Sequence, residues 1–336
     1  MYNPSEAGKK GTIFGLPHSL KEADLVFLPI HLDATVSSAD GTAKSPSLIL
    51  SESSQLDLSL ISIENPWQLK MAMHPKIVAK SQNEIHRGRA KNVIKAFELG
   101  KKVDQEQLHF VNEFCQKVVI EVERVSKLLL ESEKIVAVVG GDHSSPLGLM
   151  YALASKYEFG ILQIDAHMDL RDAYEGFLYS HASIMFNALK NDHIIHLTQV
   201  GVRDFCEEEE RLVERSQNRI DVFFDENIFS QKQKEVNWKK HCKAIVETLP
   251  DLVYISFDID GLEPSLCPHT GTPVPGGLTF HEAVYLIDQV ARSGKKIIGF
   301  DVCETGNYSW DARVASRILF RLAACTGVSN RLLRFK

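Results

Sequence analysis

Short hydrophobic runs recur along the chain, separated by longer stretches in which hydrophobic residues return every three or four positions. The short runs are rich in Val, Ile and Phe and contain few polar residues, which is typical of strands buried on both faces of a sheet. Seven of these runs predict strands, at residues 23–30, 134–140, 159–165, 196–202, 221–224, 252–258 and 296–302.

Three of the longer stretches have helical spacing of their hydrophobic residues. They predict helices within 107–133, at 281–294, where Gly294 is a stop signal, and at 311–324. Strands that alternate with helices indicate βαβ connections. The pattern therefore predicts an α/β fold with a mostly parallel central sheet.

The domain organisation follows from the absence of any linker, repeat or low-complexity tract along the chain. We expect a single domain over 1–336, in which 1–22 form a loosely packed N-terminal extension. Residues 31–90 are richer in Ser and Asn and predict loops and short helices packed on the sheet. Within them, the polar segment 60–95 contains no motif that we can place.

The composition is that of an ordinary globular protein, with 336 residues, 44% hydrophobic, 24% charged and a net charge of −6. A net negative charge argues against nucleic acid or an anionic membrane as a partner. No hydrophobic run approaches the roughly 20 residues of a membrane span, and no secretory signal is visible. Six scattered cysteines fit reduced thiols in a cytoplasmic protein.

Acidic and imidazole side chains cluster where the predicted strands end. Because ligands bind beyond the carboxyl ends of parallel strands, this edge is the candidate site. Alternate residues of an extended chain share a face, so neighbouring members of the cluster can point together. The strand ends supply these residues: Asp142, His143, Asp165, His167, Asp169, Asp258, Asp260, Asp301 and Glu304.

Four of these carboxylates and two imidazoles form the candidate metal-binding set: His143, Asp165, His167, Asp169, Asp258 and Asp260. So many like charges repel one another unless cations neutralise them. Oxygen and imidazole donors without thiolate suit Mn²⁺-like ions, and six ligands favour two bridged ions about 3.5–4 Å apart. For any one fragment, a helix cap or a turn is the competing interpretation.

Three motifs resemble those of the ureohydrolase superfamily, which includes arginase and agmatinase. They are GGDHS at 140–144, DAHMD at 165–169 and SFDIDGLEP at 256–264, which continues into TGTPVPGGLTF. DGTAKSP at 40–46 resembles the loop at the mouth of the family's site, and the segment 304–324 resembles its last motif and helix. The resemblance implies a three-layer α-β-α fold.

The resemblance also implies individual roles. His143, Asp165, Asp169 and Asp258 would bind one ion, and Asp165, His167, Asp258 and Asp260 the other, so that Asp165 and Asp258 bridge. Asp169 would in addition orient the attacking water, which the metals activate. His181 occupies the position of the proton-shuttling histidine, and Glu304 that of the carboxylate that binds the guanidinium group. Thr272 would line that pocket.

The substrate class rests on finer details of the resemblance. The sequence DLRDAYEGF with Arg171, and GVRDFCEEE, look like the agmatinase group, so agmatine, which lacks an α-carboxylate, is favoured over arginine. His269 stands where the family has a small residue and is a candidate substrate contact. Guanidine or a guanidino acid is the alternative substrate. The EEEE run at 207–210 predicts a solvated helix start.

The predicted cofactor is two Mn²⁺ per chain, with Ni²⁺ as the alternative because both accept His and carboxylate ligands. The resemblance implies a homo-oligomer, a trimer or hexamer. Two other classes of protein remain as alternatives: a single-zinc deacylase, against which the lack of a His-His pair argues, and a catalytically degenerate binding protein.

Overall fold

The computed structural model describes residues 8–75, 77 and 80–336 of the chain. Its centre is one eight-stranded sheet in which every pairing is parallel, with the order β2-β1-β3-β8-β7-β4-β5-β6. The strands are β1 Leu25–Pro29, β2 Met71–Met73, β3 Ile135–Val139, β4 Phe159–Ile164, β5 Ile194–Val200, β6 Ile220–Phe223, β7 Leu252–Asp258 and β8 Lys296–Cys303.

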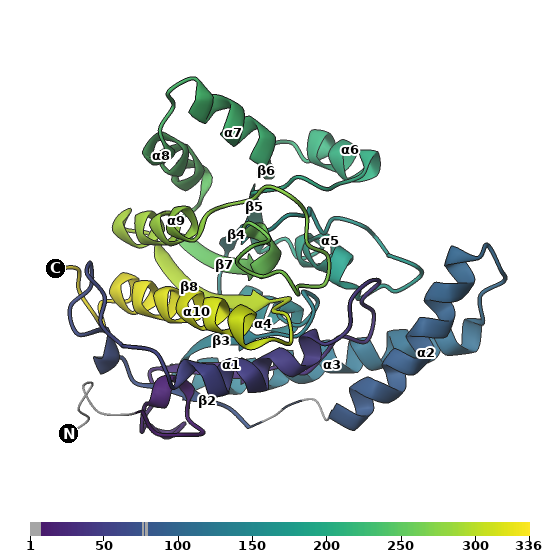
Figure 1. Ribbon diagram of the computed structural model, residues 1–336, viewed down its shortest axis with the longest axis horizontal. Coiled ribbons are helices and arrows are strands. Elements are labelled where there is room, and N and C mark those ends of the chain that lie inside the picture. The colour runs from purple at the N-terminus through teal and green to yellow at the C-terminus, as the bar shows by residue number, and fades with distance from the viewer. Residues whose placement is uncertain (1–7, 76, 78–79) are drawn as a thin grey trace.

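Ten α-helices surround the sheet within the described part of the chain (Figure 1). They are α1 Ser45–Ser53, α2 Lys80–Glu98, α3 Gln105–Glu131, α4 Leu147–Ala154, α5 Ile184–Leu189, α6 Glu207–Arg215, α7 Asp225–Gln233, α8 Trp238–Thr248, α9 Phe280–Arg292 and α10 Ser309–Ser329.

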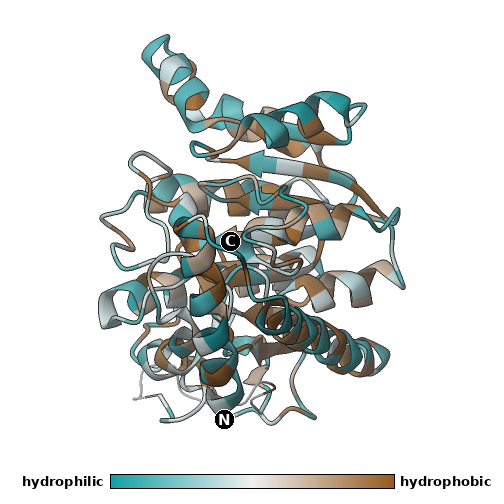
Figure 2. Cartoon of the chain, turned by 90° about the vertical axis from the view of Figure 1, so that its right-hand side faces the viewer, coloured by the Kyte–Doolittle hydropathy of each residue, from teal (hydrophilic) through white to brown (hydrophobic). Residues whose placement is uncertain are grey.

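Two hydrophobic clusters, one on each face of the sheet, make this a three-layer α-β-α protein. One cluster contains residues of α1, α7, α8, α9 and α10, and the other contains residues of α2, α3, α4 and α5. Helical ribbons alternate between hydrophobic and hydrophilic colours in Figure 2, as expected of helices with one buried side. The predicted fold class is confirmed.

The seven predicted strands are all present, with ends within two residues of the prediction. β4 shows why they could be found, since all six of its residues are buried. The 3-residue edge strand β2 and the 19-residue helix α2 were not predicted. β2 lies in the segment 31–90, which we expected to hold loops and short helices, and α2 begins there and continues to Glu98. Among the described residues, no helix is long and hydrophobic enough to cross a membrane.

The N-terminal segment is packed more tightly than predicted. Ile13 and Phe14 are each only 1% exposed, and the Phe14 ring lies edge-on to Phe27 and Phe320, with centroids 5.8 and 5.1 Å away. The expectation of loose packing over 1–22 is therefore wrong for this part, because these side chains fill the core between β1 and α10. Residues 1–7 lie outside the described residues.

Candidate metal centre

The four central strands of the sheet, in the order β3-β8-β7-β4, deliver the candidate site residues at their carboxyl ends. His143 follows β3, Asp165 follows β4, Asp258 ends β7, and Glu304 follows β8. Parallel register brings these ends level, as the pairing of Asp258 with Cys303 shows. Residues more than 160 positions apart in sequence therefore meet at one edge of the sheet.

The first group of donors surrounds the Nδ1 atom of His143. This atom lies 2.8 Å from Oδ2 of Asp169, 3.0 Å from Oδ2 of Asp165 and 3.3 Å from Oδ2 of Asp258. Nδ1 nevertheless makes no hydrogen bond of good geometry with them. Three carboxylates converging on one ring nitrogen are the arrangement expected around a cation that all four residues bind.

The second group adjoins the first. Nδ1 of His167 lies 3.1 Å from Oδ2 of Asp260 and 3.6 Å from Oδ1 of Asp165. The ligand atoms of His143, Asp165 and Asp258 are close enough to hold one ion, and so are those of Asp165, His167 and Asp260. Asp165 belongs to both of these groups and Asp169 to neither, so the metal-binding role of Asp169 stays a prediction. Asp258 falls in the first group only, so its bridging role stays a prediction.

The electrostatics of the cluster favour a bound cation. Burial and the neighbouring carboxylates of Asp260 and Asp165 raise the pKa of Asp258 well above its usual range. Burial and Asp165 likewise raise the pKa of Asp169 to about 7. In contrast, the carboxylates of Asp165 and Asp169 raise the pKa of His143, although burial alone lowers it. Negative charge is thus costly here unless a positive charge compensates it.

The far side of the His143 ring is held by a buried chain of hydrogen bonds. Nε2 of His143 lies 2.9 Å from Oγ of Ser256, and this hydroxyl donates to Oδ2 of Asp301 at 2.9 Å. The Tyr254 hydroxyl donates to the same oxygen at 2.8 Å. If Nε2 carries the proton, Nδ1 is left with its lone pair facing the carboxylates, as a metal ligand requires. Asp301 therefore orients a candidate ligand rather than joining the cluster.

Backbone geometry at the site is unusual in two places. Asp169 and Glu304 have φ of 56° and 57°, a left-handed conformation that costs L-residues on the order of 1 kcal/mol. A close approach also explains one glycine, because a Cβ on Gly141 would lie 1.8 Å from the Leu32 carbonyl oxygen. The GGDHS motif thus lets the loop that carries His143 pass directly over the end of β1.

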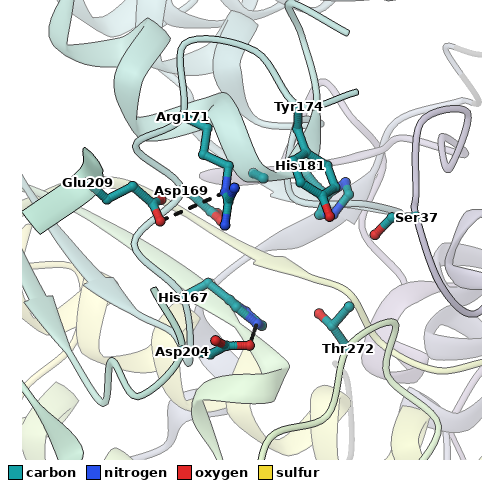
Figure 3. Close-up of a pocket in the computed structure, with 10 residues that line it drawn as sticks. Ser37, His167, Asp169, Arg171, Tyr174, His181, Asp204, Glu209 and Thr272 are labelled. Atoms are coloured by element: carbon teal, nitrogen blue, oxygen red, sulfur yellow. Dashed lines mark ion pairs between the residues drawn. The ribbon is translucent and has the colours of Figure 1, made fainter. Parts of the chain in front are cut away.

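A cavity of about 150 Å³ opens beside the cluster (Figure 3). It is lined by Ser37, His167, Asp169, Arg171, Tyr174, His181, Ala182, Asp204, Glu209 and Thr272. Arg171 points toward Glu209, with Nε 3.8 Å from Oε2, and its guanidinium lies over the Tyr174 ring. Three predicted substrate or proton-transfer residues, Arg171, His181 and Thr272, therefore share one cavity.

Glu304 is buried and is not among the residues that line that cavity. Its Oε1 accepts a hydrogen bond from the His143 amide at 2.9 Å, while its buried Oε2 has no hydrogen-bond partner among the described residues. Burial, together with Asp142, raises the pKa of Glu304 well above its usual range. A Cβ on Gly271 would lie 3.1 Å from Oε2, so this glycine leaves room next to the free oxygen.

His269 is not among the residues that line the cavity. Its Nδ1 lies 2.9 Å from Oδ2 of the buried Asp311, its amide donates to Oδ1 at 3.0 Å, and its ring stacks on Tyr308. These contacts fix the loop that follows β7. The predicted contact of His269 with substrate stays a prediction that the cavity does not support.

Sequence reasoning missed four polar residues of the cavity: Ser37, Tyr174, Asp204 and Glu209. The expectation of a solvated helix start holds for Glu207, Glu208 and Glu210, which are exposed at the start of α6, but not for Glu209, which is only 3% exposed. Its Oε2 accepts from the Cys206 amide and its Oε1 from the Leu170 amide, both at 3.0 Å. A glutamate three residues after the cap of a helix often accepts a hydrogen bond from the amide of the cap residue. The spacing of Cys206 and Glu209 in the sequence could therefore have indicated that Glu209 is not free in solvent.

Comparison with known proteins agrees with the geometry. Residues 23–325 match the arginase family. The chain is 30% identical over 285 residues to an N(1)-aminopropylagmatine ureohydrolase of Thermus thermophilus, covering 84% of this chain and 83% of that protein. It is 31% identical over 215 residues to the agmatinase of Sodalis glossinidius, covering 63% of each.

Solved structures share the fold. The agmatine ureohydrolase of Thermoplasma volcanium superposes with a TM-score of 0.71 at 23% identity, over 96% of each chain. A Trypanosoma cruzi formiminoglutamase with Mn²⁺ superposes with a TM-score of 0.70 at 14% identity, over 92% of this chain and 95% of that one. With the family match covering most of the chain, the protein belongs to the arginase family.

Proposed function

We propose that the protein is a ureohydrolase that cleaves agmatine, or a cationic relative of it, into urea and an amine. The observation that carries the proposal is the pair of donor groups that share Asp165 beside a cavity lined by His181. Two divalent cations, which we propose to be Mn²⁺ with Ni²⁺ as the alternative, would activate a water for attack on the guanidinium carbon.

The chain's own residues bind and orient the substrate in this proposal. Oε2 of Glu304, which has no hydrogen-bond partner in the described part of the chain, accepts from a guanidinium N–H, and the positive charge of the substrate favours the ionised carboxylate. Asp169 adjoins both His143 and the cavity, so it can accept a hydrogen bond from the attacking water. Burial lowers the pKa of His181 to about 3, so the neutral ring accepts the proton that the attacking water releases and passes it to the departing amine. Thr272 lines the space next to these groups.

The preference for a cationic tail rests on the cavity and on the relatives. Asp204 and Glu209 give the cavity acidic side chains, and relatives of the chain are named agmatinase or aminopropylagmatine ureohydrolase. A guanidino acid is the second candidate, because Arg171 offers a guanidinium for a carboxylate. The ion pair of Arg171 with Glu209 weakens that second candidate, since it already compensates the arginine charge.

A substrate panel tests the proposal. We expect urea from agmatine or N(1)-aminopropylagmatine with Mn²⁺ or Ni²⁺, and two ions per chain by metal analysis. Urea from guanidine or a guanidino acid alone would transfer the proposal to the second candidate. No urea from any substrate would reject it, and one zinc per chain would favour the single-zinc deacylase. We also propose that the protein is cytoplasmic and forms a homo-oligomer, a trimer or hexamer. Light scattering of the purified protein measures the mass of the assembly.

His181→Ala tests the proton-transfer step. We expect kcat to fall about 100-fold with two ions retained, because general acid catalysis contributes roughly that factor or more. The ring lies 6.0 Å edge-on from Tyr174 and lines the cavity, so added imidazole should enter the space and restore part of kcat. The exposed His281 gives the control, and His281→Ala should leave kcat unchanged. Loss of the ions from His181→Ala would contradict the role.

A further inference from the structure

The helices α2 and α3 extend outward together at one end of the molecule (Figure 1). Each of them bonds to a loop that contributes residues to the lining of the cavity. We call residues 33–43 the mouth loop; it carries Ser37. We call residues 171–181 the facing loop; it carries Arg171, Tyr174 and His181. Side chains from both loops line the cavity, and a substrate tail longer than the guanidinium has to pass near them.

Asn83 of α2 anchors the start of the mouth loop. Its Nδ2 donates to Oδ1 of Asp33 at 2.7 Å, and its Oδ1 accepts from the Asp33 amide at 2.9 Å. The other oxygen of Asp33 accepts from the amides of Gly41 and Ala43, at 3.0 and 3.3 Å. Both ends of the mouth loop are therefore tied to one buried pair of side chains.

Arg87, one helical turn further along α2, holds the middle of the mouth loop. Its guanidinium donates to the Val36 carbonyl oxygen, and its Nε donates to Oδ1 of Asp40 at 2.7 Å. These two partners lie on either side of Ser37 in the sequence. Because Arg87 is only 8% exposed, its buried positive charge needs fixed hydrogen-bond partners. Its planar guanidinium group can bond to both Val36 and Asp40 at once.

The facing loop is held from α3. Nδ2 of Asn112 donates to the Gly176 carbonyl oxygen at 3.0 Å, and its Oδ1 accepts from the Leu178 amide at 2.9 Å. Gly176 has a φ of 79°, and a Cβ there would lie 3.0 Å from Leu108 of α3. The hairpin of α2 and α3 thus fixes both loops. Burial is the main cause of the lowered pKa of His181, and the positive charges of His167, His143 and Arg87 add to it.

We propose that Arg87 is a positioning residue that fixes Ser37 at the mouth and thereby sets the affinity for the substrate tail. The inference rests on the proposed function, since it concerns the same cavity. Arg87 is not among the residues that line the cavity, so it acts through the mouth loop. A ligand that consists of the guanidinium ion alone has no tail and should not respond to this residue.

The test compares Arg87→Ala with the wild-type, metal-loaded protein. We expect KM for agmatine to rise about tenfold while kcat changes less than about threefold, because a misplaced loop weakens binding more than chemistry. The inhibition constant of the guanidinium ion should stay the same. Arg87→Lys keeps the positive charge, but an ammonium group cannot bond Val36 and Asp40 as the planar guanidinium does. Its KM for agmatine should therefore lie between those of the wild type and Arg87→Ala.

Lys91→Ala is the matched control, because Lys91 lies one turn further on α2, is exposed and pairs with the same Asp40 without bonding a loop carbonyl. It should behave as the wild type. If no urea forms, calorimetric binding of agmatine to the metal-loaded variants measures the effect instead, and a protein that binds agmatine but forms no urea rejects the proposed function alone. An unchanged KM and binding constant in Arg87→Ala, or an equal loss of guanidinium binding, would reject the inference. Should Arg87→Ala not fold, Arg87→Lys decides.

Discussion

Asp165→Asn is expected to lose both cations and to lower kcat/KM by about 1000-fold or more. Asp165 is the one residue shared by the two donor groups, with oxygens 3.0 Å from His143 Nδ1 and 3.6 Å from His167 Nδ1. Asparagine keeps the shape of the side chain but removes the negative charge that both cations need. The loss of several kcal/mol of transition-state stabilisation corresponds to about this factor.

The measurement is metal content by mass spectrometry together with urea release. Asp172→Asn is the control, because Asp172 is an exposed aspartate nearby in the sequence whose partner is the surface residue Lys190. It should keep two ions and full activity. Two ions and undiminished urea release in Asp165→Asn would show that the cluster is not the catalytic centre, whatever the fold resembles.

Glu304→Gln is expected to lower kcat/KM by about 100-fold while leaving two ions bound. The Oε1 atom accepts the His143 amide, and a glutamine oxygen can still do so. The second oxygen, Oε2, becomes an amide that cannot accept from a guanidinium N–H, so a buried charged hydrogen bond is lost. The cost should appear mainly as weaker binding of every guanidino substrate and of the guanidinium ion itself.

Metal content distinguishes two possible roles of Glu304, binding the guanidinium group and holding the loop that carries His143. A variant that loses ions would show that the carboxylate serves to hold the His143 loop, and the guanidinium role would then be wrong. Glu263→Gln is the control, because Glu263 follows β7 and its carboxylate accepts a hydrogen bond from the hydroxyl of the nearby Ser265, at 3.1 Å. It should match the wild type in both measurements. Unlike Arg87→Ala, Glu304→Gln should impair tailed and tailless ligands alike.

The strands could be predicted because burial on both faces leaves a continuous hydrophobic run, as in the six buried residues of β4. The same logic failed for β2, whose three residues at the sheet edge are too few to form a pattern. It also failed for α2, whose sequence KSQNEIHRGRAKNVIKAFE has few hydrophobic residues. That helix is held by polar contacts to the mouth loop as well as by Ala90, Val93 and Ile94 in the core.

The cavity shows a second limit of sequence reasoning. Glu209 looked like one of four equivalent exposed carboxylates, yet its two oxygens satisfy the amides of Cys206 and Leu170 and it lines the cavity. His269 looked like a pocket residue because of its place in the loop after β7, but its ring faces Asp311 and Tyr308. Position in a motif does not say which way a side chain points.

The sequence by itself determined the α/β class, the strands and the set of metal-type donors, because those depend on local patterns and on where polar residues follow buried strands. Only the tertiary structure decided how these donors meet: it puts Asp165 in both groups but Asp258 in one, and Asp301 behind His143 through Ser256. It also joined α2 to the mouth loop across some fifty residues of chain. The reason is physical, since the order of strands in the sheet and the contacts between distant loops are fixed by packing of the whole chain and leave no local pattern.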